Sequence, residues 1–406
     1  MKLLFISDNF PPEVNAPATR TYEHCSEWVG LGADVTVITC FPNFPTGNVY
    51  DGYKNKCYQK ELIDGIKVIR VGTYISANEG FLKRTLDYFS FAIMATIFGL
   101  FIKTELIIAT SPQFFSAAAG RWLSFLKRKP WVMEVRDLWP ESIKNVEAMK
   151  PGLGMSFLEW WEHRLYKTSR CIVVVTDSFK TFIINRGFSP EKIHVVKNGV
   201  NANLYVPKAK SQALLNKLNV NNKFIISYIG THGMAHRLDF ILHCAATITD
   251  PTFHFLFIGD GAEKNSLIKL KNELGLKNVT MLDSIKKNEV PEYFSISDIS
   301  LIPLKKSTLF QTVIPSKIFE SSAMQIPILL GVEGESKTII ESYGAGLCFD
   351  PENETDFIQK LNQLYTNKTL YNSCKSGCED LATAFDRKQL AKKMYRILQD
   401  QLLISA

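Results

Sequence analysis

The sequence predicts an α/β protein with two doubly wound, mainly parallel sheets. Short apolar or β-branched runs alternate with amphipathic stretches of helix length, which is the pattern of parallel strands covered by helices. The alternation pauses across residues 198–222, which are rich in Asn and Lys, and then restarts. A chain of 406 residues is long enough for two or three domains. We therefore expect one α/β domain over residues 1–203 and a second over residues 204–383.

Thirteen short runs supply the predicted strands of the two sheets. The first domain contains Leu3–Ile6, Val35–Thr39, Val68–Val71, Leu106–Thr110, Trp131–Glu134, Ile172–Val175 and Ile193–Val196. The second domain contains Phe224–Ile229, Phe253–Ile258, Val279–Leu282, Ile299–Ile302, Ile326–Leu330 and Leu347–Phe349. After the last strand, Leu381–Leu403 carries spaced apolar residues among lysines and arginines. This spacing predicts that the chain ends in a helix.

Composition narrows the functional class. With 46% hydrophobic and 21% charged residues, the chain is an ordinary globular protein and is neither a coiled coil nor largely disordered. The formal net charge of +7 is too small for an obligate nucleic-acid binder, but it suits an anionic ligand or a membrane face. The eight cysteines are scattered without CxxC pairs, and the apolar amino terminus is too short for a signal peptide. We therefore expect reduced thiols and a cytoplasmic protein.

One apolar segment departs from the alternation. Residues 88–102 are uncharged, and as a helix they would reach about 22 Å, which is less than the roughly 30 Å of a bilayer core. The segment is therefore either a core helix or a wedge lying in a membrane surface next to Lys83 and Arg84. A second stretch that is basic and aromatic, residues 121–131, favours contact with an anionic bilayer.

Two glycine turns follow predicted strands of the second domain. A strand, a glycine turn and a helix start leave backbone amides where a phosphate can bind, although either turn could simply be tight. The candidate binding residues in these turns are Gly230, Thr231, His232, Gly233, Arg237, Gly259, Asp260 and Lys264.

A third candidate turn precedes the predicted helix of residues 316–324. Pro315 ends a loop, Ser316 is a suitable N-cap, and Lys317 and Glu320 lie three residues apart on one helix face. The ammonium suits a diphosphate and the carboxylate suits the hydroxyls of a ribose, so we assign Lys317 and Glu320 catalytic roles and Pro315 and Ser316 binding roles. The alternative is an exposed Lys–Glu pair on a helix surface.

The first domain offers candidates at two strand ends. Glu13 and Asn15 follow the first strand, where a ligand can approach the backbone, and Glu13 could equally be a surface turn acid. Arg136 and Asp137 end the strand at Trp131–Glu134, where they either act in catalysis or neutralise each other. The chain lacks a GxGxxG dinucleotide motif and a DxD metal motif. We therefore expect no cofactor and no metal site.

Taken together, these motifs resemble one family. The matching runs are residues 11–20, 41–47, 134–142, 197–200, 259–264 and 313–320. They are similar to the retaining, family-4 type of glycosyltransferase with the GT-B fold, in particular its bacterial O-antigen and capsule branch, which includes N-acetylfucosamine transferases. The resemblance implies two Rossmann-like domains with catalysis in a cleft between them. It also implies that the terminal helix, residues 384–406, crosses back to the first domain.

The resemblance also implies roles for single residues. Glu320 matches the second glutamate of the family's E-x7-E motif and would hold the ribose, whereas Thr312 stands in place of the first. Thr231 and His236 stand where many members carry an arginine and a lysine for the diphosphate. We expect Lys317, with Arg237 and helix amides, to replace that clamp. Arg136 stands where many members carry a histidine.

The implied reaction moves a sugar from a UDP-linked donor to a hydroxyl of a lipid-linked glycan of the undecaprenyl-diphosphate type, with retention of configuration and without a metal ion. Without a convincing carboxylate nucleophile in the first domain, we expect front-face attack. The enzyme would act peripherally on the cytoplasmic face of the inner membrane, without nucleic acid. Two alternatives remain at this point. They are a nucleotide-sugar oxidoreductase or epimerase, and a membrane-docked scaffold without catalysis.

Overall fold

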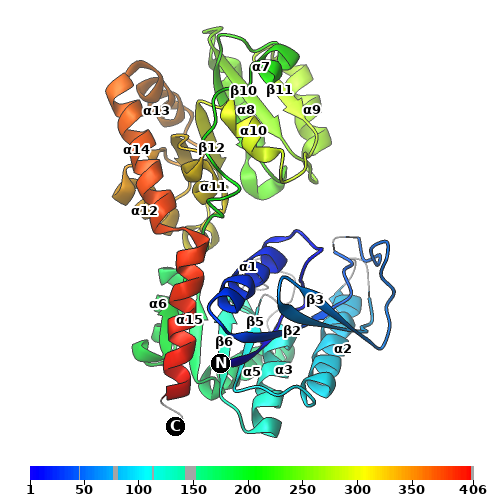
Figure 1. Ribbon diagram of the computed structural model, residues 1–406. Helices are drawn as coiled ribbons and strands as arrows, with labels where there is room; N and C mark the ends of the chain where they lie inside the picture. The colour runs from blue at the N-terminus through cyan, green and yellow to red at the C-terminus, as the bar shows by residue number, and fades with distance from the viewer. Residues whose placement is uncertain (45, 76–80, 112–113, 142–151, 404–406) are drawn as a thin grey trace. The chain divides into compact units, whose positions relative to one another are not determined.

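The computed structural model describes residues 1–44, 46–75, 81–111, 114–141 and 152–403. The chain forms two compact units (Figure 1). Unit 1 consists of Met1–Lys197 and Lys388–Ala406, and unit 2 consists of Asn198–Arg387. The divisions therefore fall at Lys197 and Arg387, a few residues from the positions expected from the sequence.

Unit 1 is built on an eight-stranded sheet with the order β3-β4-β2-β1-β5-β6-β7-β8. The strands are β1 (Lys2–Ile6), β2 (Asp34–Cys40), β3 (Tyr58–Ile63), β4 (Ile66–Val71), β5 (Leu106–Thr110), β6 (Trp131–Val135), β7 (Cys171–Val174) and β8 (Ile193–Val195). All neighbouring strands are parallel except β3 and β4. Because β1 pairs with both β2 and β5, the turn that follows β1 lies at the middle of the carboxyl edge.

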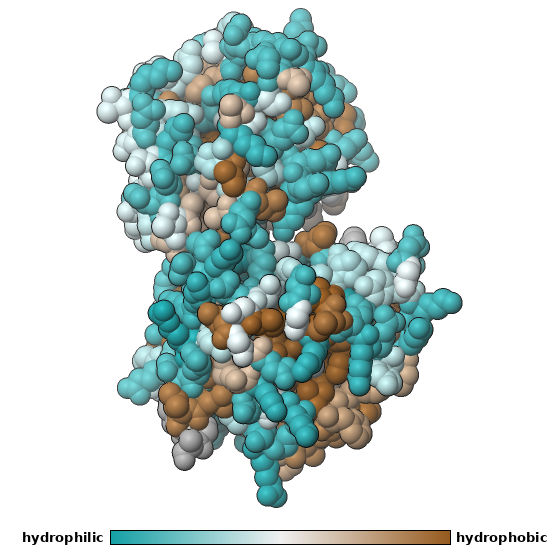
Figure 2. All heavy atoms as spheres, viewed as in Figure 1, coloured by the Kyte–Doolittle hydropathy of each residue, from teal (hydrophilic) through white to brown (hydrophobic). Residues whose placement is uncertain are grey.

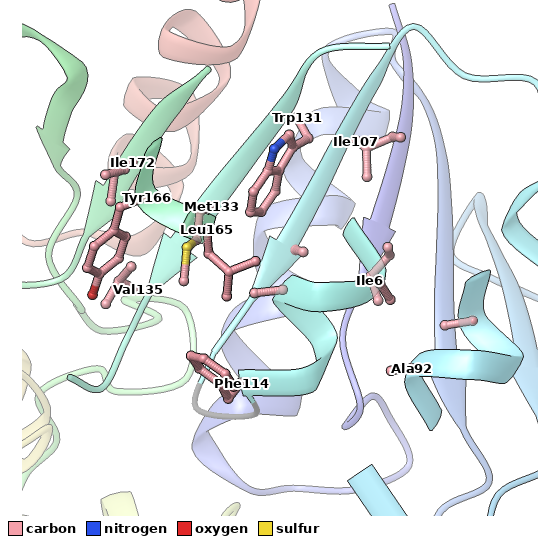
Figure 3. Packing of buried hydrophobic residues seen from close by; sticks show 14 of the residues in the cluster. Ile6, Ala92, Ile107, Phe114, Trp131, Met133, Val135, Leu165, Tyr166 and Ile172 are labelled. Carbon is pink, nitrogen blue, oxygen red and sulfur yellow. The ribbon is translucent and has the colours of Figure 1, made fainter. Parts of the chain in front are cut away.

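Helices cover both faces of this sheet. The described helices of unit 1 are α1 (Ala16–Gly30), α2 (Phe81–Gly99), α3 (Phe114–Lys127), α5 (Leu153–Thr168), α6 (Asp177–Asn185), the 3-10 turn η1 (Pro190–Lys192) and α15 (Arg387–Leu403). Side chains of α2, α3, α5 and α6 pack against one face of the sheet. Figure 3 shows part of this core, in which Phe114 of α3, Leu165 of α5 and Met133 of β6 belong to one cluster of buried residues.

The opposite face of the first sheet is covered by α1 and by the carboxyl-terminal helix α15. Leu390, Met394 and Leu398 of α15 are buried with Trp28 of α1 against this face. The indole Nε1 of Trp28 also donates a hydrogen bond of 2.9 Å to the carbonyl of Ala391. The last helix of the chain is therefore part of the core of unit 1.

Unit 2 contains a second parallel sheet with the order β11-β10-β9-β12-β13-β14. Its strands are β9 (Phe224–Ile229), β10 (Phe253–Ile258), β11 (Val279–Leu282), β12 (Ile299–Pro303), β13 (Ile328–Gly331) and β14 (Gly346–Cys348). Its helices are α7 (Gln212–Leu218), η2 (Met234–His236), α8 (Leu238–Thr247), α9 (Lys264–Glu273), α10 (Val290–Ser295), η3 (Leu309–Thr312), α11 (Lys317–Ala323), α12 (Glu335–Tyr343), α13 (Glu354–Thr366) and α14 (Lys368–Ala384). Because β9 lies between β10 and β12, the turns after these three strands are neighbours.

The predicted fold class is confirmed, and two details differ from the sequence-based expectations. Strand β3 was not predicted, although Asp64-Gly65 between β3 and β4 is a typical hairpin turn and both residues have positive φ (48° and 81°). The expected helix at Leu381–Leu403 is instead the end of α14 and the whole of α15, which are separated at Phe385 and Asp386. No described helix is both long and apolar enough to span a membrane.

Candidate functional site

The turns after β9 and β10 pack backbone against backbone. A Cβ on Gly259 would lie 1.8 Å from the carbonyl oxygen of Gly230, and a Cβ on Gly261 would lie 2.4 Å from the carbonyl oxygen of His232. Gly230 and Gly259 both have a φ of 147°, a conformation that side-chain-bearing residues rarely adopt. Glycine is therefore required here both for the conformation and for the close approach of the two turns.

Hydrogen bonds fix the two turns together. The amide of Gly230 donates a hydrogen bond of 2.8 Å to the carbonyl of Ile258, and the amide of His232 donates one of 2.8 Å to the carbonyl of Asp260. The amide of Glu263 donates in return to the carbonyl of His232. The amides of Gly230 and His232 are thus used inside the protein, which leaves fewer backbone donors for a phosphate than the sequence suggested.

Lys317 brings the third turn into contact with the first. A Cβ on Gly230 would lie 2.5 Å from the Lys317 ammonium, so this glycine makes room for the lysine side chain. The Nζ atom lies 4.9 Å from the centroid of the Tyr228 ring, which is a cation–π distance. Within the described part of the chain, no hydrogen bond or ion pair holds this ammonium. Its positive charge therefore remains available to an anion at the turn after β9.

Electrostatics couple Lys317 to Glu320, one turn further along α11. Burial lowers the pKa of the Lys317 ammonium, and the nearby Glu320 carboxylate opposes this shift. Burial raises the pKa of Glu320, whereas Lys317, Lys287, Arg387 and a hydrogen bond with Tyr205 lower it. The carboxylate therefore lies among positive charges and can accept hydrogen bonds from neutral hydroxyl groups.

Helix α11 is only seven residues long. Ser316 occupies its N-cap position without a capping hydrogen bond from its side chain, and the carbonyl of Pro315 accepts a bond from the amide of Ile318. The contribution of this turn to a ligand site therefore rests on the Lys317 side chain.

The imidazoles of His232 and His236 lie close to the Tyr228 ring that Lys317 also contacts. The rings of His232 and His236 lie 5.9 and 5.8 Å from the ring of Tyr228. His232 is fully buried, and neither of its ring nitrogens has a hydrogen-bond partner among the described residues. Burial lowers the pKa of each histidine to about 4, helped by Lys264 at His232 and by Lys317 at His236. Both rings are therefore neutral at pH 7.

The other two predicted cations of unit 2 are held by protein groups. The ammonium of Lys264 donates to the carbonyls of Gly259 and Leu282, so it braces the ends of β10 and β11. The guanidinium of Arg237 pairs with Asp239 at 3.1 Å and with Glu352 at 3.0 Å. Lys317 differs from both because its charge has no such partner in the described chain.

In unit 1, the predicted residues after β1 organise the loop. The buried Glu13 carboxylate accepts hydrogen bonds of 2.9 Å from the amides of Asn43 and Phe44 and from the side chain of Asn9. Asn15 is the N-cap of α1, and its side chain accepts from the amide of Ala18. Glu13 therefore ties the turn after β1 to the turn after β2.

The end of β6 holds Arg136 and Asp137, whose amides both donate to the hydroxyl of Ser111. Beside them lies a buried ion pair that the sequence analysis did not single out. The guanidinium of Arg20 binds the Glu134 carboxylate at 3.0 Å and donates to the carbonyls of Val196 and Lys197.

This pair has a clear electrostatic signature. Burial alone would raise the pKa of Glu134, but the positive charges of Arg20 and Arg136 hold it below its ordinary value. The spacing of an arginine in the first helix and a glutamate in a buried strand gave no local signal, because the two residues are 114 positions apart. Among the described residues, no group of three or more His, Cys, Asp or Glu is placed to hold a metal ion.

Two sequence families match the chain. "Glycosyl transferase 4-like domain" matches residues 15–199, and "Glycosyl transferases group 1" matches residues 210–379. The chain therefore belongs to the family-4 type of GT-B glycosyltransferases, as its motifs predicted. Since both matches are to glycosyltransferases, the oxidoreductase and scaffold alternatives are set aside.

Individual relatives agree with this assignment. The chain is 24% identical over 377 residues to a putative colanic acid biosynthesis glycosyl transferase, WcaI, of Escherichia coli, covering 89% of this chain and 92% of that one. It is 33% identical over 200 residues to a putative teichuronic acid biosynthesis glycosyltransferase, TuaH, of Bacillus subtilis, covering 49% of each chain. The structure of Anabaena Alr3699/HepE in complex with UDP-glucose superposes with a TM-score of 0.71 at 15% identity, covering 98% of this chain and 100% of the other. This last likeness shows the shared fold.

Proposed function

We propose that this glycosyltransferase moves a sugar from a UDP-linked donor to a lipid-linked glycan during the synthesis of a bacterial surface polysaccharide. The observation that carries the proposal is the Lys317 ammonium, which lies over Tyr228 beside the Gly230 turn and makes no hydrogen bond or ion pair in the described chain. A partly buried cation of this kind favours binding of a diphosphate.

The choice of donor and acceptor rests on the relatives. The Anabaena protein of the same fold is described in complex with UDP-glucose, which supports a UDP donor. WcaI and TuaH are named for colanic acid and teichuronic acid, which supports a polysaccharide product. We further propose a lipid-linked acceptor of the undecaprenyl-diphosphate type, used at the cytoplasmic face of the inner membrane. An N-acetylated deoxyhexosamine such as N-acetylfucosamine is the donor sugar that we would test first.

The proposed transfer retains the anomeric configuration. The acceptor hydroxyl oxygen bonds to the anomeric carbon on the face from which the diphosphate leaves, and its proton passes to an oxygen of the departing phosphate. Lys317 stabilises the negative charge that develops on the diphosphate, so no metal ion is required. Glu320 accepts hydrogen bonds from the ribose hydroxyls, and the glycine turns admit the diphosphate. We assign Arg136 and Asp137 to contact with the acceptor.

The test compares two lysine variants of unit 2. Lys317→Ala removes the proposed leaving-group charge, and Lys269→Ala removes an exposed charge from α9 as a matched control. We expect Lys317→Ala to lower the transfer rate by about 10²- to 10³-fold at saturating donor, the usual cost of losing one such stabilising group. Lys269→Ala should retain full activity. UDP should raise the melting temperature of the native protein more than GDP or ADP does.

Two results would contradict the proposal. Full transfer by Lys317→Ala at saturating donor would remove Lys317 from the mechanism. Absence of both sugar transfer and UDP-sugar hydrolysis across a panel of donors would contradict the proposed donor class.

A further inference from the structure

Helix α2 is apolar on two opposite faces. Phe91, Ala92 and Ala95 are fully buried in the core of unit 1, which is the packing expected of a helix on a sheet. The opposite face carries exposed apolar side chains at intervals of three or four residues. These are Leu86, Phe89, Ile93, Ile97 and Leu100, followed by Phe101, each at least 39% exposed. A helix that covers one side of a sheet in water normally has polar residues on this outer face.

The neighbouring helices extend this apolar face. Helix α3 packs beside α2, where the rings of Phe89 and Phe115 meet at 6.1 Å and the Lys127 ammonium donates to the carbonyl of Leu100. The end of α3 exposes Phe125 (81%) and Leu126. Helix α5 also packs against α3. It exposes Leu153, Phe157 and Trp160, again at helical spacing.

We call these exposed residues of α2, α3 and α5, together with Phe101, the apolar outer face of unit 1. In Figure 2, hydrophobic side chains gather at the lower right of the view, where Figure 1 draws α2. The stripe from Leu86 to Ile97 alone is about 17 Å long. An apolar surface of this extent on a protein in water indicates a contact with something else.

Positive charges border the apolar outer face. Lys83 and Arg84 are exposed at the start of α2, Lys103 follows its end, and Arg128 and Lys129 follow α3. Beyond the end of α2 there is also a cavity of about 600 Å³ that begins at Ile102. Its charged lining residues are Lys2, Lys60, Lys67, Lys103, Asp34 and Glu61. Lysines thus outnumber acids in the lining of the cavity.

From this arrangement we infer that the apolar outer face of unit 1 docks on an anionic lipid bilayer, with α2 lying in the plane of the interface. The apolar side chains enter the region between headgroups and acyl chains, and the bordering lysines and arginines contact lipid phosphates. The inference rests on the proposed function only in that a lipid-linked acceptor gives the docking its purpose.

The same charges disfavour a second copy of this chain as the occupant. A symmetric dimer through this face would oppose like charges across the interface, because a two-fold contact uses the same patch on both subunits. An anionic bilayer complements both the apolar surface and its basic border. Docking at the surface of the bilayer is also consistent with the lengths of the described helices, none of which is apolar and long enough to cross the membrane.

The test measures co-flotation of the full chain with vesicles. Vesicles of phosphatidylglycerol and phosphatidylcholine are compared with vesicles of phosphatidylcholine alone. We expect binding to the anionic vesicles, weakened by added salt. Ile93→Gln combined with Ile97→Gln should lower the partition coefficient at least about tenfold, because both side chains lose apolar area that enters the bilayer. Arg128→Gln combined with Lys129→Gln should lower it by about 25-fold, about fivefold for each charge.

Matched controls come from unit 2. Val206→Gln with Ile268→Gln removes two exposed apolar residues, and Lys208→Gln with Lys217→Gln removes two exposed charges. Both controls should bind vesicles as the native protein does. All four variants change exposed side chains, and unchanged melting curves would verify that each one folds.

Three results would overturn the inference. The native protein could fail to bind anionic vesicles, the Ile93 and Ile97 double variant could bind as tightly as the native protein, or that variant could convert a dimer in solution to a monomer. The last result would assign the face to a second copy. A protein that binds UDP-sugar but not vesicles would overturn this inference and leave the proposed function intact, whereas a protein that binds vesicles but no nucleotide would do the reverse.

Discussion

The two units share an architecture but differ in what they leave unsatisfied. Of the 22 exposed large apolar side chains among the described residues, 18 lie in unit 1 and four in unit 2. The candidate site residues at the strand ends of the two units also differ. At the strand ends of unit 1, Glu13 binds two backbone amides and Arg20 pairs with Glu134, whereas at the strand ends of unit 2 the Lys317 ammonium and the His232 ring nitrogens have no hydrogen bond or ion pair in the described chain.

This difference indicates that two units of similar fold are suited to different binding partners. A buried polar group without a partner is costly, so it persists where a ligand supplies the missing partner. An exposed apolar stripe likewise persists where a surface covers it. The turns around Lys317 in unit 2 are therefore suited to a polar small molecule, and the exposed apolar side chains of unit 1 are suited to an apolar surface.

The largest expected effect concerns the buried ion pair of unit 1. Arg20→Met leaves the Glu134 carboxylate buried without its partner and frees the carbonyls of Val196 and Lys197. The free energy of unfolding, measured in urea, should fall by about 3–5 kcal/mol. As a control, Lys67→Met breaks the exposed pair with Asp34 and should change it by less than about 1 kcal/mol. Equal effects of the two variants would contradict the structural role given to Arg20.

A smaller loss of stability is expected at Glu13. Glu13→Ala leaves the amides of Asn43 and Phe44 without an acceptor and should destabilise unit 1 by about 1–3 kcal/mol. Glu191→Ala, an exposed acid of the same unit, is the control and should leave stability unchanged. The acceptor KM of the same two variants, measured in a transfer assay, tests whether Glu13 also contacts substrate. A raised acceptor KM for Glu13→Ala at unchanged stability would show that Glu13 binds substrate and does not tie the loops.

The smallest expected effect is a pH dependence in unit 2. Burial lowers the pKa of His254 to about 4 from an ordinary value of 6.5, so between these values the unfolded chain binds a proton that the folded chain does not. Stability is therefore fully present above about pH 6.5 and is lost as the pH falls toward 4. We expect His254→Gln to remove about 1–2 kcal/mol of the difference in unfolding free energy between pH 7 and pH 5. An unchanged pH profile in the variant would show that His254 titrates normally in the fold.

Most strands of the two sheets could be predicted from the sequence, because a buried strand depends on a local pattern of apolar residues. Leu106–Thr110 and Phe253–Ile258 are strands with the predicted bounds, since a continuous apolar run bounded by polar residues identifies a buried parallel strand. In strand β3 three consecutive residues of six, Gln59, Lys60 and Glu61, are polar and no side chain is fully buried, so the strand contains no continuous apolar run. It is an edge strand, which explains why a search for apolar runs overlooks it.

The candidate site could be predicted only in part, for a related reason. The three candidate turns of unit 2 were identified from the sequence, and the contact between Gly230 and Lys317 follows from the topology, because parallel strands end at one edge of the sheet. Sequence could not reveal which cations are already held by protein groups. Lys264 and Lys317 look alike in the sequence, yet one donates to two backbone carbonyls and the other lies over an aromatic ring.

The position of α15 has a consequence for the order in which the protein can mature. Leu390, Met394 and Leu398 complete an apolar layer whose other members come from the first strands and the first helix, and Trp28 reaches Ala391 across 363 positions. A nascent chain emerging from the ribosome presents the start of that layer long before its last piece exists. The amino-terminal unit therefore finishes folding only after α15 has been synthesised, and a chaperone that shields the half-made layer should bind chains truncated before residue 388 more than chains that include α15.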